Sequence, residues 1–363
     1  LCGNTTMDVK RTPEGKLIMP DCLATDVPKA NKLSDAMASP FWPYWKEAVQ
    51  KERESMAKYT VFDFIKQPKR KPRTVDTKWI FKVKPLPNGK IEKFRARLVA
   101  RGFSQIKGVD FNETFSPVAR YESIRLVLSL TANYDLELHN MDVDVAFLNG
   151  ELEEKIYADD PGGLGCPPGH LLRVNKALYG LKQSPRVFNK DFHKALLALG
   201  LKQSQADPCI YHLITKRRFI IVGIFVDDVL IATRGNKDMQ IIKQCLTRKY
   251  SMSDKGEVVY FLGMEIKRNR KQKTLKIHQT RYVTDVLKRF DMTTANPVRS
   301  PMNTGIKLSK KNSPTTPQDV EFMKDKPYRQ LIGSLLYAAI STRPDISFSV
   351  SFISRFLSCP GPA

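Results

Sequence analysis

The chain of 363 residues is long enough to bury a hydrophobic core and to form roughly two or three lobes. Its 42% hydrophobic and 27% charged residues exclude wholesale disorder, and no uncharged apolar run of about 18 residues predicts a membrane span. The formal net charge of +23 favours a polyanionic partner.

The start of the chain and its cysteines indicate its origin and its redox environment. It begins at Leu1, without an initiator methionine or a signal-peptide pattern, so we expect a piece of a longer reading frame. The cysteines form no C-x-x-C pair and have no histidine at zinc spacing, which favours reduced intracellular thiols over disulfides or structural zinc. They are Cys2, Cys22, Cys166, Cys209, Cys245 and Cys359.

The N-terminal third contains a linker-like segment, a helix and a basic hairpin. Residues 1–42 are polar, proline-punctuated and aperiodic, which predicts a linker. Over 43–58 the side chains of Trp45, Val49 and Met56 share one helical face, which predicts an amphipathic packing helix.

The segment from Lys66 to Arg101 carries thirteen Lys/Arg against two acids, Asp76 and Glu92. A solvated basic face or a disordered tail is one interpretation. Because apolar residues alternate through it, we predict instead a two-stranded hairpin turned at 87–89, with a basic surface that follows phosphates.

Helices and strands alternate through the rest of the chain. Residues 121–134 predict a helix that leads into the strand carrying Asp142. The Gly/Pro-rich stretch 161–169 lacks the Gly-Lys-Ser/Thr ending of a phosphate loop and predicts a turn. Ser184 and Pro185 predict a helix start, with Ser184 as N-cap, and Gly200 ends that helix.

The C-terminal third predicts a helix over 241–250, a hairpin of strands 258–266 and 274–278, an irregular stretch over 295–325 and a helix over 328–340. The whole pattern indicates an α+β fold with antiparallel strands around the carboxylates.

Asp227 and Asp228 lie between the apolar runs 219–225 and 229–233, and a further apolar strand carries Asp142. At about 4 Å two such charges repel by roughly 4 kcal/mol, so they stay ionised only beside a cation. Oxygen ligands without His or Cys select Mg²⁺ or Mn²⁺. Of the two aspartates in this strand, we predict Asp142 as the ligand and Asp144 as a bystander.

Two such ions can activate an attacking hydroxyl and stabilise the leaving oxygen in a phosphoryl transfer. Together with the basic hairpin, the aspartates indicate phosphoryl chemistry on nucleic acid, with synthesis and hydrolysis both open. An Asp-Asp pair in a turn is a weak motif by itself, because Asp is common in turns.

The order of several motifs makes the chain resemble the reverse transcriptase region of copia-type long-terminal-repeat retrotransposon polyproteins. The resemblance covers roughly residues 43–357. The matching runs are Lys93–Phe103, Glu113–Arg120, Met141–Gly150, Leu178–Arg186, Phe225–Val229, Phe261–Gly263, Tyr328–Tyr337 and Arg343–Ile346.

This resemblance implies a right-hand polymerase with fingers, palm and thumb and an antiparallel palm sheet backed by helices. Its divisions would be a linker over 1–42, the N-terminal helix over 43–58, fingers over 59–137, a palm over 138–250 with a fingers insertion at about 160–189, a primer-grip hairpin and thumb over 251–325, and the start of a connection segment over 326–363, truncated before any ribonuclease H domain.

The resemblance also implies roles for particular residues. Asp142, Asp227 and Asp228 would be catalytic and bind two Mg²⁺ ions, or Mn²⁺ in their place, with the Val143 carbonyl as a further ligand. Phe147 would exclude a 2′-hydroxyl, although core packing is its alternative. The residues implied to bind the nucleotide and the template are Arg97, Lys82, Lys84, Tyr179, Lys182 and Ser184, with Arg95 as the alternative to Arg97.

Phe261, Leu262 and Gly263 would form the primer grip, with buried-strand packing as the alternative. The family has a tyrosine where this chain has Phe225, and a lysine where it has Asp144. Neither departure removes a metal ligand.

The implied function is DNA synthesis on an RNA or DNA template, as in reverse transcription during retrotransposition. The implied partners are RNA and DNA template–primer and deoxynucleoside triphosphates, with no membrane, in a polyprotein with integrase upstream and ribonuclease H downstream. We expect an intracellular site, in a cytoplasmic particle or the nucleus. The alternative is a catalytically silent nucleic-acid-binding fragment of a decayed element; a two-metal nuclease is disfavoured because the sequence suggests no water-activating base.

Overall fold

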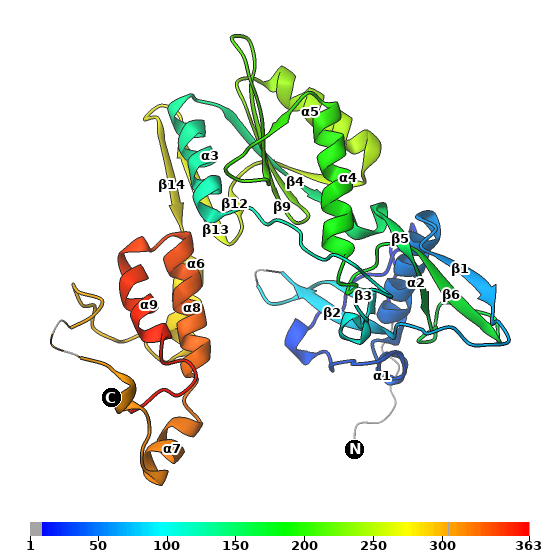
Figure 1. Ribbon diagram of the computed structural model, residues 1–363, viewed down its shortest axis with the longest axis horizontal. Coiled ribbons are helices and arrows are strands. Elements are labelled where there is room, and N and C mark those ends of the chain that lie inside the picture. Colours follow the sequence, from blue (N-terminus) through cyan, green and yellow to red (C-terminus); the bar gives the residue numbers. More distant parts are fainter. Residues whose placement is uncertain (1–8, 87, 304, 306, 363) are drawn as a thin grey trace.

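The computed structural model describes residues 9–86, 88–303, 305 and 307–362. Its strands form four separate sheets in which all pairs of strands run antiparallel. In Figure 1 the blue and cyan N-terminal elements form one group, the central sheet with its helices a second, and the orange and red helices near the C-terminus a third. The α+β class predicted from the sequence is confirmed.

The largest sheet has six strands in the order β11-β4-β10-β9-β8-β7. Its central strands β9 and β10 are buried on both faces, as continuous apolar runs predict. The strands are β4 (Glu137–Val143), β7 (Lys202–Gln203), β8 (Ile210–Ile214), β9 (Phe219–Phe225), β10 (Asp228–Thr233) and β11 (Met252–Glu257).

Helices cover both faces of this sheet, and side chains alternate between them. Val229 and Ile231 of β10 pack with helices α4 (Ser184–Ala198) and α5 (Asn236–Lys249). Leu230 and Ala232 pack on the other side with α3 (Tyr121–Asn133). The sheet is therefore held between two cores, and its ends are fixed in position.

The start of α4 corrects one prediction. Ser184 and Pro185 are the first two helical residues, and Gln183 occupies the N-cap position. The Ser184 hydroxyl donates instead to the Leu178 carbonyl at 2.6 Å, inside the protein. The tertiary hydrogen bond has replaced the local cap that the sequence favours.

The basic hairpin is confirmed as strands β2 (Thr77–Pro85) and β3 (Ile91–Ala100), which lie on helix α2 (Trp42–Lys58). Trp79 pairs with Leu98 and Phe81 with Ala96, so the apolar faces coincide as predicted. Pro87, in the predicted turn, lies outside the described residues. Helix α2 buries Trp45, Val49 and Met56, as its pattern predicts.

Strands β1 (Phe62–Lys66), β6 (His170–Lys176) and β5 (Glu151–Ala158) form a three-stranded sheet that the sequence did not indicate. Residue Phe62 pairs with Val174, more than a hundred positions away, which no local pattern reveals. Figure 1 shows this sheet beside α2, so the segment around 151–176 packs with the basic hairpin rather than with the six-stranded sheet.

The expectation of a linker over 1–42 is wrong for its described part. The segment contains a 3-10 turn, η1 (Ala24–Asp26), and helix α1 (Leu33–Ala38), and Leu23 bridges to Lys90 in the turn of the basic hairpin. Its buried side chains join the core beneath that hairpin because a few apolar residues suffice when they pack on an existing surface. They are Leu17, Val27, Ala36 and Phe41.

The C-terminal third holds strands β12 (Tyr260–Phe261), β13 (Met264–Asn269) and β14 (Thr274–His278). The predicted single strand over 258–266 is wrong in extent, because a two-residue turn at 262–263 folds β12 back on β13. Helices follow, including one in the stretch expected to be irregular. They are α6 (Thr280–Arg289), α7 (Pro317–Lys324), α8 (Tyr328–Ser341) and α9 (Ser347–Ser354).

Short 3-10 turns complete the structure: η2 (Gly102–Ser104), η3 (Ala146–Asn149), η4 (Lys310–Asn312) and η5 (Pro344–Ile346). Among the helices of the described residues, none has the length and apolar character that a membrane crossing requires. Five cysteines in this part of the chain are free thiols, and Cys2 lies outside it.

Candidate active site

Two of the three predicted aspartates are direct neighbours across strands. Asp228, the first residue of β10, pairs with Asp142 of β4 on one side and with Phe225 of β9 on the other. Residues directly opposite each other have Cβ atoms about 4.5–5.5 Å apart. The register therefore brings the two carboxylates to one point at the end of the sheet.

Asp227 occupies the two-residue turn between β9 and β10, beside this pair. The Val143 amide donates to the Asp227 carbonyl at 2.9 Å, which ties the turn to the end of β4. The residue before it, Val226, has a φ of 58°, in the left-handed region that β-branched side chains rarely adopt. Such strain costs about 1–3 kcal/mol and is concentrated at functional sites.

Two further bulky residues near the site share this strained conformation. Val145, just beyond β4, and Leu262, in the β12–β13 turn, both have a φ of 47°. The packed sheet and its flanking cores hold these turns in place. Sequence patterns cannot reveal such strain, because nothing in the residue type of Val or Leu favours it.

The carboxylates are electrostatically coupled. Burial, followed by the charges of Asp227 and Asp142, raises the pKa of Asp228 to about 6. Burial also raises the pKa of Asp227, and Asp142 adds to the effect, while Arg97 and Arg95 oppose it. The edge thus concentrates negative charge that a divalent cation would neutralise.

The donor set fits a hard cation, since it consists of carboxylate oxygens. Within the described ranges, however, no three His, Cys, Asp or Glu side chains stand close enough together to hold a metal by themselves. The strand register nevertheless places Asp142 opposite Asp228, with Asp227 in the adjoining turn.

Asp144 lies outside this cluster. Strand alternation alone would put it on the same face as Asp142, because the two are two residues apart. The strand, however, ends at Val143, and the Asp144 carboxylate accepts hydrogen bonds from the hydroxyls of Ser251 and Ser253 at 3.2 and 3.1 Å. These hydroxyls occupy the carboxylate, and the role of Asp144 as a bystander stays a prediction.

The basic face of the hairpin meets the site through Tyr179. The Arg97 guanidinium lies 4.2 Å from the centre of the Tyr179 ring, and burial raises the pKa of the Tyr179 hydroxyl. The centre of the Phe147 ring lies 4.7 Å from the centre of the Tyr179 ring. Arg97, Tyr179 and Phe147 thus form a continuous row of side chains, and the charge of Asp227 also acts to raise the pKa of Tyr179.

Arg95 lies on the same strand face as Arg97, as predicted. Burial, then the charge of Arg97, lowers the pKa of Arg95, while Tyr179 and Asp142 act in the opposite direction. Both arginines are therefore near the acidic edge, and it is Arg97 that contacts Tyr179.

The remaining predicted nucleotide residues are spread out. Lys82 pairs with Arg95 and Lys84 with Lys93 on the same basic face, and burial lowers the pKa of Lys84. The Lys182 ammonium lies against the Phe111 ring and the Gln105 carbonyl, on the neighbouring loop. Ser184 is fully buried, so the structure contradicts a direct nucleotide contact for it.

The predicted primer-grip residues divide between core and turn. Phe261 is buried in the core beneath α3, which favours the packing alternative for this side chain. Leu262 and Gly263 form the turn, with φ values of 47° and 77°. The turn therefore presents backbone, rather than the Phe261 side chain, to its surroundings.

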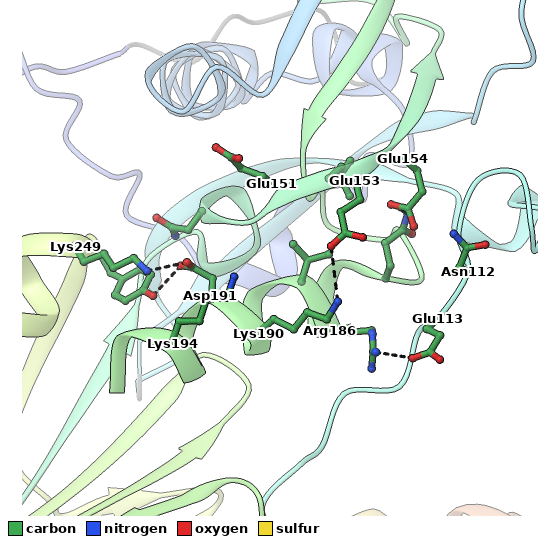
Figure 2. A pocket seen from close by; sticks show the side chains of 15 residues that line it. Asn112, Glu113, Glu151, Glu153, Glu154, Arg186, Lys190, Asp191, Lys194 and Lys249 are labelled. Carbon is green, nitrogen blue, oxygen red and sulfur yellow. Dashed lines mark hydrogen bonds and ion pairs between the residues drawn. The ribbon is translucent and has the colours of Figure 1, made fainter. Parts of the chain in front are cut away.

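A cavity of about 700 Å³ lies along α4, and its lining includes none of the three aspartates. Figure 2 shows that its charged side chains point toward one another: Lys249 toward Asp191, Arg186 toward Glu113 and Lys190 toward Glu153. Because these charges are already paired with one another, we interpret the cavity as a solvated hollow in the surface. The strand register locates the candidate site at the end of β4 and β10 instead.

One residue near the site was missed by the sequence analysis. Glu52 of α2 accepts a hydrogen bond from the Leu98 amide at 3.3 Å, next to Arg97. Burial raises the pKa of Glu52, and the charges of Arg97 and Arg95 oppose that shift. The sequence did contain a signal for Glu52: its carboxylate falls within the apolar stripe of Trp45, Val49 and Met56, where burying a charge is costly.

An antiparallel sheet backed by helices, with aspartates at the end of its central hairpin, is the arrangement of an α+β polymerase fold. The sequence model of the family described as reverse transcriptase (RNA-dependent DNA polymerase) matches residues 59–304. The chain belongs to this family. The resemblance seen in the sequence is confirmed.

The chain is 39% identical over 342 residues to the retrovirus-related Pol polyprotein from transposon TNT 1-94 of Nicotiana tabacum, which covers 93% of this chain and 26% of that protein. It is 34% identical over 318 residues to the Pol polyprotein from transposon RE2 of Arabidopsis thaliana, with coverages of 87% and 21%. A putative transposon Ty5-1 protein of Saccharomyces cerevisiae is 33% identical over 61% of this chain and 70% of its own length.

The chain thus spans about a quarter of the tobacco relative. A solved structure of a foamy viral protease-reverse transcriptase in complex with double-stranded DNA matches 85% of this chain and 43% of its own chain, with 13% identity and a TM-score of 0.39.

Proposed function

We propose that the chain is an RNA-directed DNA polymerase that adds deoxynucleotides to a primer 3′ end on an RNA or DNA template. The observation that carries the proposal is the strand register in which Asp142 lies opposite Asp228, with Asp227 in the adjoining turn. Membership of the reverse transcriptase family supports it.

Asp142, Asp227 and Asp228 would hold two Mg²⁺ ions, with the Val143 carbonyl as a further candidate ligand. When bound, such ions supply charge neutralisation and an activated primer hydroxyl. The Val143 amide donates to the Asp227 carbonyl, so β4 holds the backbone that carries the Asp227 carboxylate.

Arg97 would bind the triphosphate, with Arg95, Lys82 and Lys84 adding positive charge from the same face. A planar guanidinium suits paired phosphate oxygens, and stacking on Tyr179 limits its orientations. Phe147, in contact with Tyr179, would close the space beside the sugar and exclude a 2′-hydroxyl.

We propose the following division of the described chain. The hairpin with α1, α2 and the sheet of β1, β5 and β6 would be the fingers, and the six-stranded sheet with α3, α4 and α5 the palm. The β12–β13 turn would be the primer grip, and the helices after β14 the thumb and connection. Free thiols in the described residues suit the intracellular particle that we propose as its location.

The experiment is primer extension by the purified chain on a primed RNA template with Mg²⁺ and deoxynucleotides. The proposal predicts metal-dependent extension that Asp227→Asn abolishes. Absence of extension by the unmodified chain, under conditions in which a full-length relative extends the same primer, would refute it.

A catalytically silent nucleic-acid-binding fragment remains the second candidate. It draws support from the lack, within the described ranges, of a closed three-carboxylate cluster. It predicts salt-sensitive binding of primed template without metal-dependent turnover. Both candidates share the salt dependence, because phosphate contacts release counterions in either case, so turnover decides between them.

A further inference from the structure

Tyr337 of α8 makes an unusual contact with the β12–β13 turn. Its hydroxyl donates to the Leu262 carbonyl at 2.9 Å. The next residue, Gly263, gives it room, because a Cβ atom at that position would overlap the Tyr337 hydroxyl. Leu262 has a φ of 47°, which is strained for a bulky residue, and Tyr337 contacts this turn from outside.

Other aromatic side chains hold Tyr337 in place. Its ring meets the Tyr282 ring of α6 edge-on, with centres 4.8 Å apart, and the Tyr282 hydroxyl donates to the Ser334 carbonyl at 3.0 Å. Burial and the neighbouring tyrosine hydroxyls raise the pKa of Tyr337 to about 12. The hydroxyl therefore keeps its proton, and can donate it, throughout the neutral range.

The same cluster reaches the acidic edge. The Tyr121 hydroxyl, at the start of α3, is a neighbour of the Tyr337 hydroxyl. The Tyr121 ring packs edge-on against Phe225, with centres 6.5 Å apart, and Phe225 pairs with Asp228. Three aromatic side chains thus connect α8 to the turn that carries Asp227.

We propose that Tyr337 is a positioning residue that fixes the Leu262–Gly263 turn, and with it the primer 3′ end, against the acidic edge of the sheet. This inference rests on the proposed function, since it needs a primer. Tyr337 lies outside residues 59–304, the part that the family's sequence model matches, although it belongs to the run Tyr328–Tyr337 named above. It acts through the turn and does not touch the reacting atoms.

A purely structural role for Tyr337 is the competing explanation, and the chain offers a matched control. Tyr328 lies on the same helix, and its hydroxyl also donates to a backbone carbonyl, that of Ile353, at 2.7 Å. That bond joins α8 to α9 and is distant from the turn along the helix. Tyr328→Phe therefore removes an equivalent hydrogen bond without affecting the turn.

The first measurement is the dissociation rate of a fluorescent primer–template from the full chain, without nucleotide. Tyr337→Phe should dissociate about five-fold faster, the change expected from one lost hydrogen bond, whereas Tyr328→Phe should match the unmodified chain. In primer extension, Tyr337→Phe should lower kcat and processivity and leave the KM for deoxynucleotide unchanged, because the Arg97 and Tyr179 side chains are untouched.

The second measurement is a double-mutant cycle with Gly263→Ala. The added methyl group meets the Tyr337 hydroxyl, so it should weaken primer binding more in the unmodified chain than in Tyr337→Phe, by at least about three-fold. Additive effects of the two substitutions would mean that the hydroxyl and the turn act independently, and would overturn the proposal even if Tyr337→Phe alone folded poorly.

The outcomes separate the two proposals. Unchanged primer dissociation in Tyr337→Phe, or an equal change in Tyr328→Phe, overturns the role of Tyr337 and leaves the polymerase assignment intact. A chain that binds primer–template but never extends it refutes the proposed function, and the dissociation rates still decide the role of Tyr337. A chain that binds no primer–template contradicts both.

Discussion

The candidate site joins two regions that differ in charge and in support: the acidic end of the six-stranded sheet and the basic face of the β2–β3 hairpin. Strands β9 and β10 are buried on both faces and lie between two cores. The hairpin has two strands only and packs one face on α2, while Lys82, Lys84, Arg95 and Arg97 share the other. The carboxylates are thus held by a sheet that is packed on both faces, whereas the arginines lie on a hairpin that is packed on one face only.

The two regions hold opposite charges apart from each other before a substrate binds. Each region holds like charges: burial and then the charges of Asp227 and Asp142 raise the pKa of Asp228, and burial and then the charge of Arg97 lower the pKa of Arg95. A metal-bound triphosphate carries both complementary charges. We therefore expect substitutions in the sheet to affect the chemical step and substitutions in the hairpin to affect nucleotide binding.

The largest effect is expected for Asp227→Asn. Loss of one carboxylate from the acidic end of the sheet should slow nucleotide addition by about 10³-fold, because metal-assisted charge stabilisation contributes several kcal/mol. Template affinity should stay the same or increase. Asp144→Asn, whose carboxylate is held by Ser251 and Ser253, is the control and should retain activity. An active Asp227→Asn protein would refute the metal assignment.

In the hairpin, Arg97→Ala should raise the KM for deoxynucleotide by about 10- to 100-fold with a smaller effect on kcat, since a charge-assisted hydrogen bond contributes about 1.5–3 kcal/mol. Arg97→Lys should restore part of the binding, because it keeps the charge but loses the planar stack on Tyr179. Lys93→Ala, on the same face but farther along the strand, provides the comparison. Equal effects at both positions would indicate a general basic surface instead of a specific contact.

Phe147→Val tests the junction between the regions. The smaller side chain should reduce discrimination against ribonucleotides by about 10-fold or more, measured as the ratio of kcat/KM values for the two sugars. Phe188→Leu changes the same aromatic cluster from the buried side and should lower stability without changing sugar selectivity. Unchanged selectivity in Phe147→Val would leave only the packing role.

These tests also show where prediction from the sequence reached its limit. The apolar runs at 219–225 and 229–233 predicted two strands and the turn between them, and the alternating pattern around Trp79 and Leu98 predicted the two-stranded hairpin. Both signals are local and periodic, so no knowledge of distant partners was needed.

The parts that were not predicted depend on distant contacts. The pairing of β1 with β6, the packing of Leu17 and Ala36 on the hairpin core, and the Ser184 hydrogen bond to Leu178 all follow from tertiary structure. The strained conformation of Val226 is imposed by the strands around it. Residue type and spacing carry no information about such contacts.

The smallest effect concerns stability near the other end of β4. Lys243 donates to His139 Nδ1 and to the Asp254 carboxylate, each at 2.7 Å, and burial followed by the Lys243 charge lowers the pKa of His139. The folded state therefore favours the neutral imidazole. Its contribution to stability is fully present above the unfolded pKa near 6.5 and is lost as the pH falls through the lower folded value.

His139→Gln should flatten this pH dependence, because the amide oxygen can accept from Lys243 without titrating. The measurement is the urea midpoint between pH 7 and pH 5. Asp254, whose pKa is lowered through its Lys243 hydrogen bonds against the opposing effect of burial, should contribute in the same direction only near and below pH 3.8. A variant as pH-sensitive as the unmodified chain would assign the effect to other groups.

The most direct test of the account is the position of Mn²⁺ in crystals of the chain with a template, a primer that lacks its 3′-hydroxyl and the next deoxynucleotide, read from anomalous scattering. The account predicts manganese within ligand distance, about 2.0–2.3 Å, of carboxylate oxygens of both Asp142 and Asp227, with the triphosphate between the ions and Arg97. Manganese bound elsewhere, or a nucleotide bound with no ion at these aspartates, would contradict it.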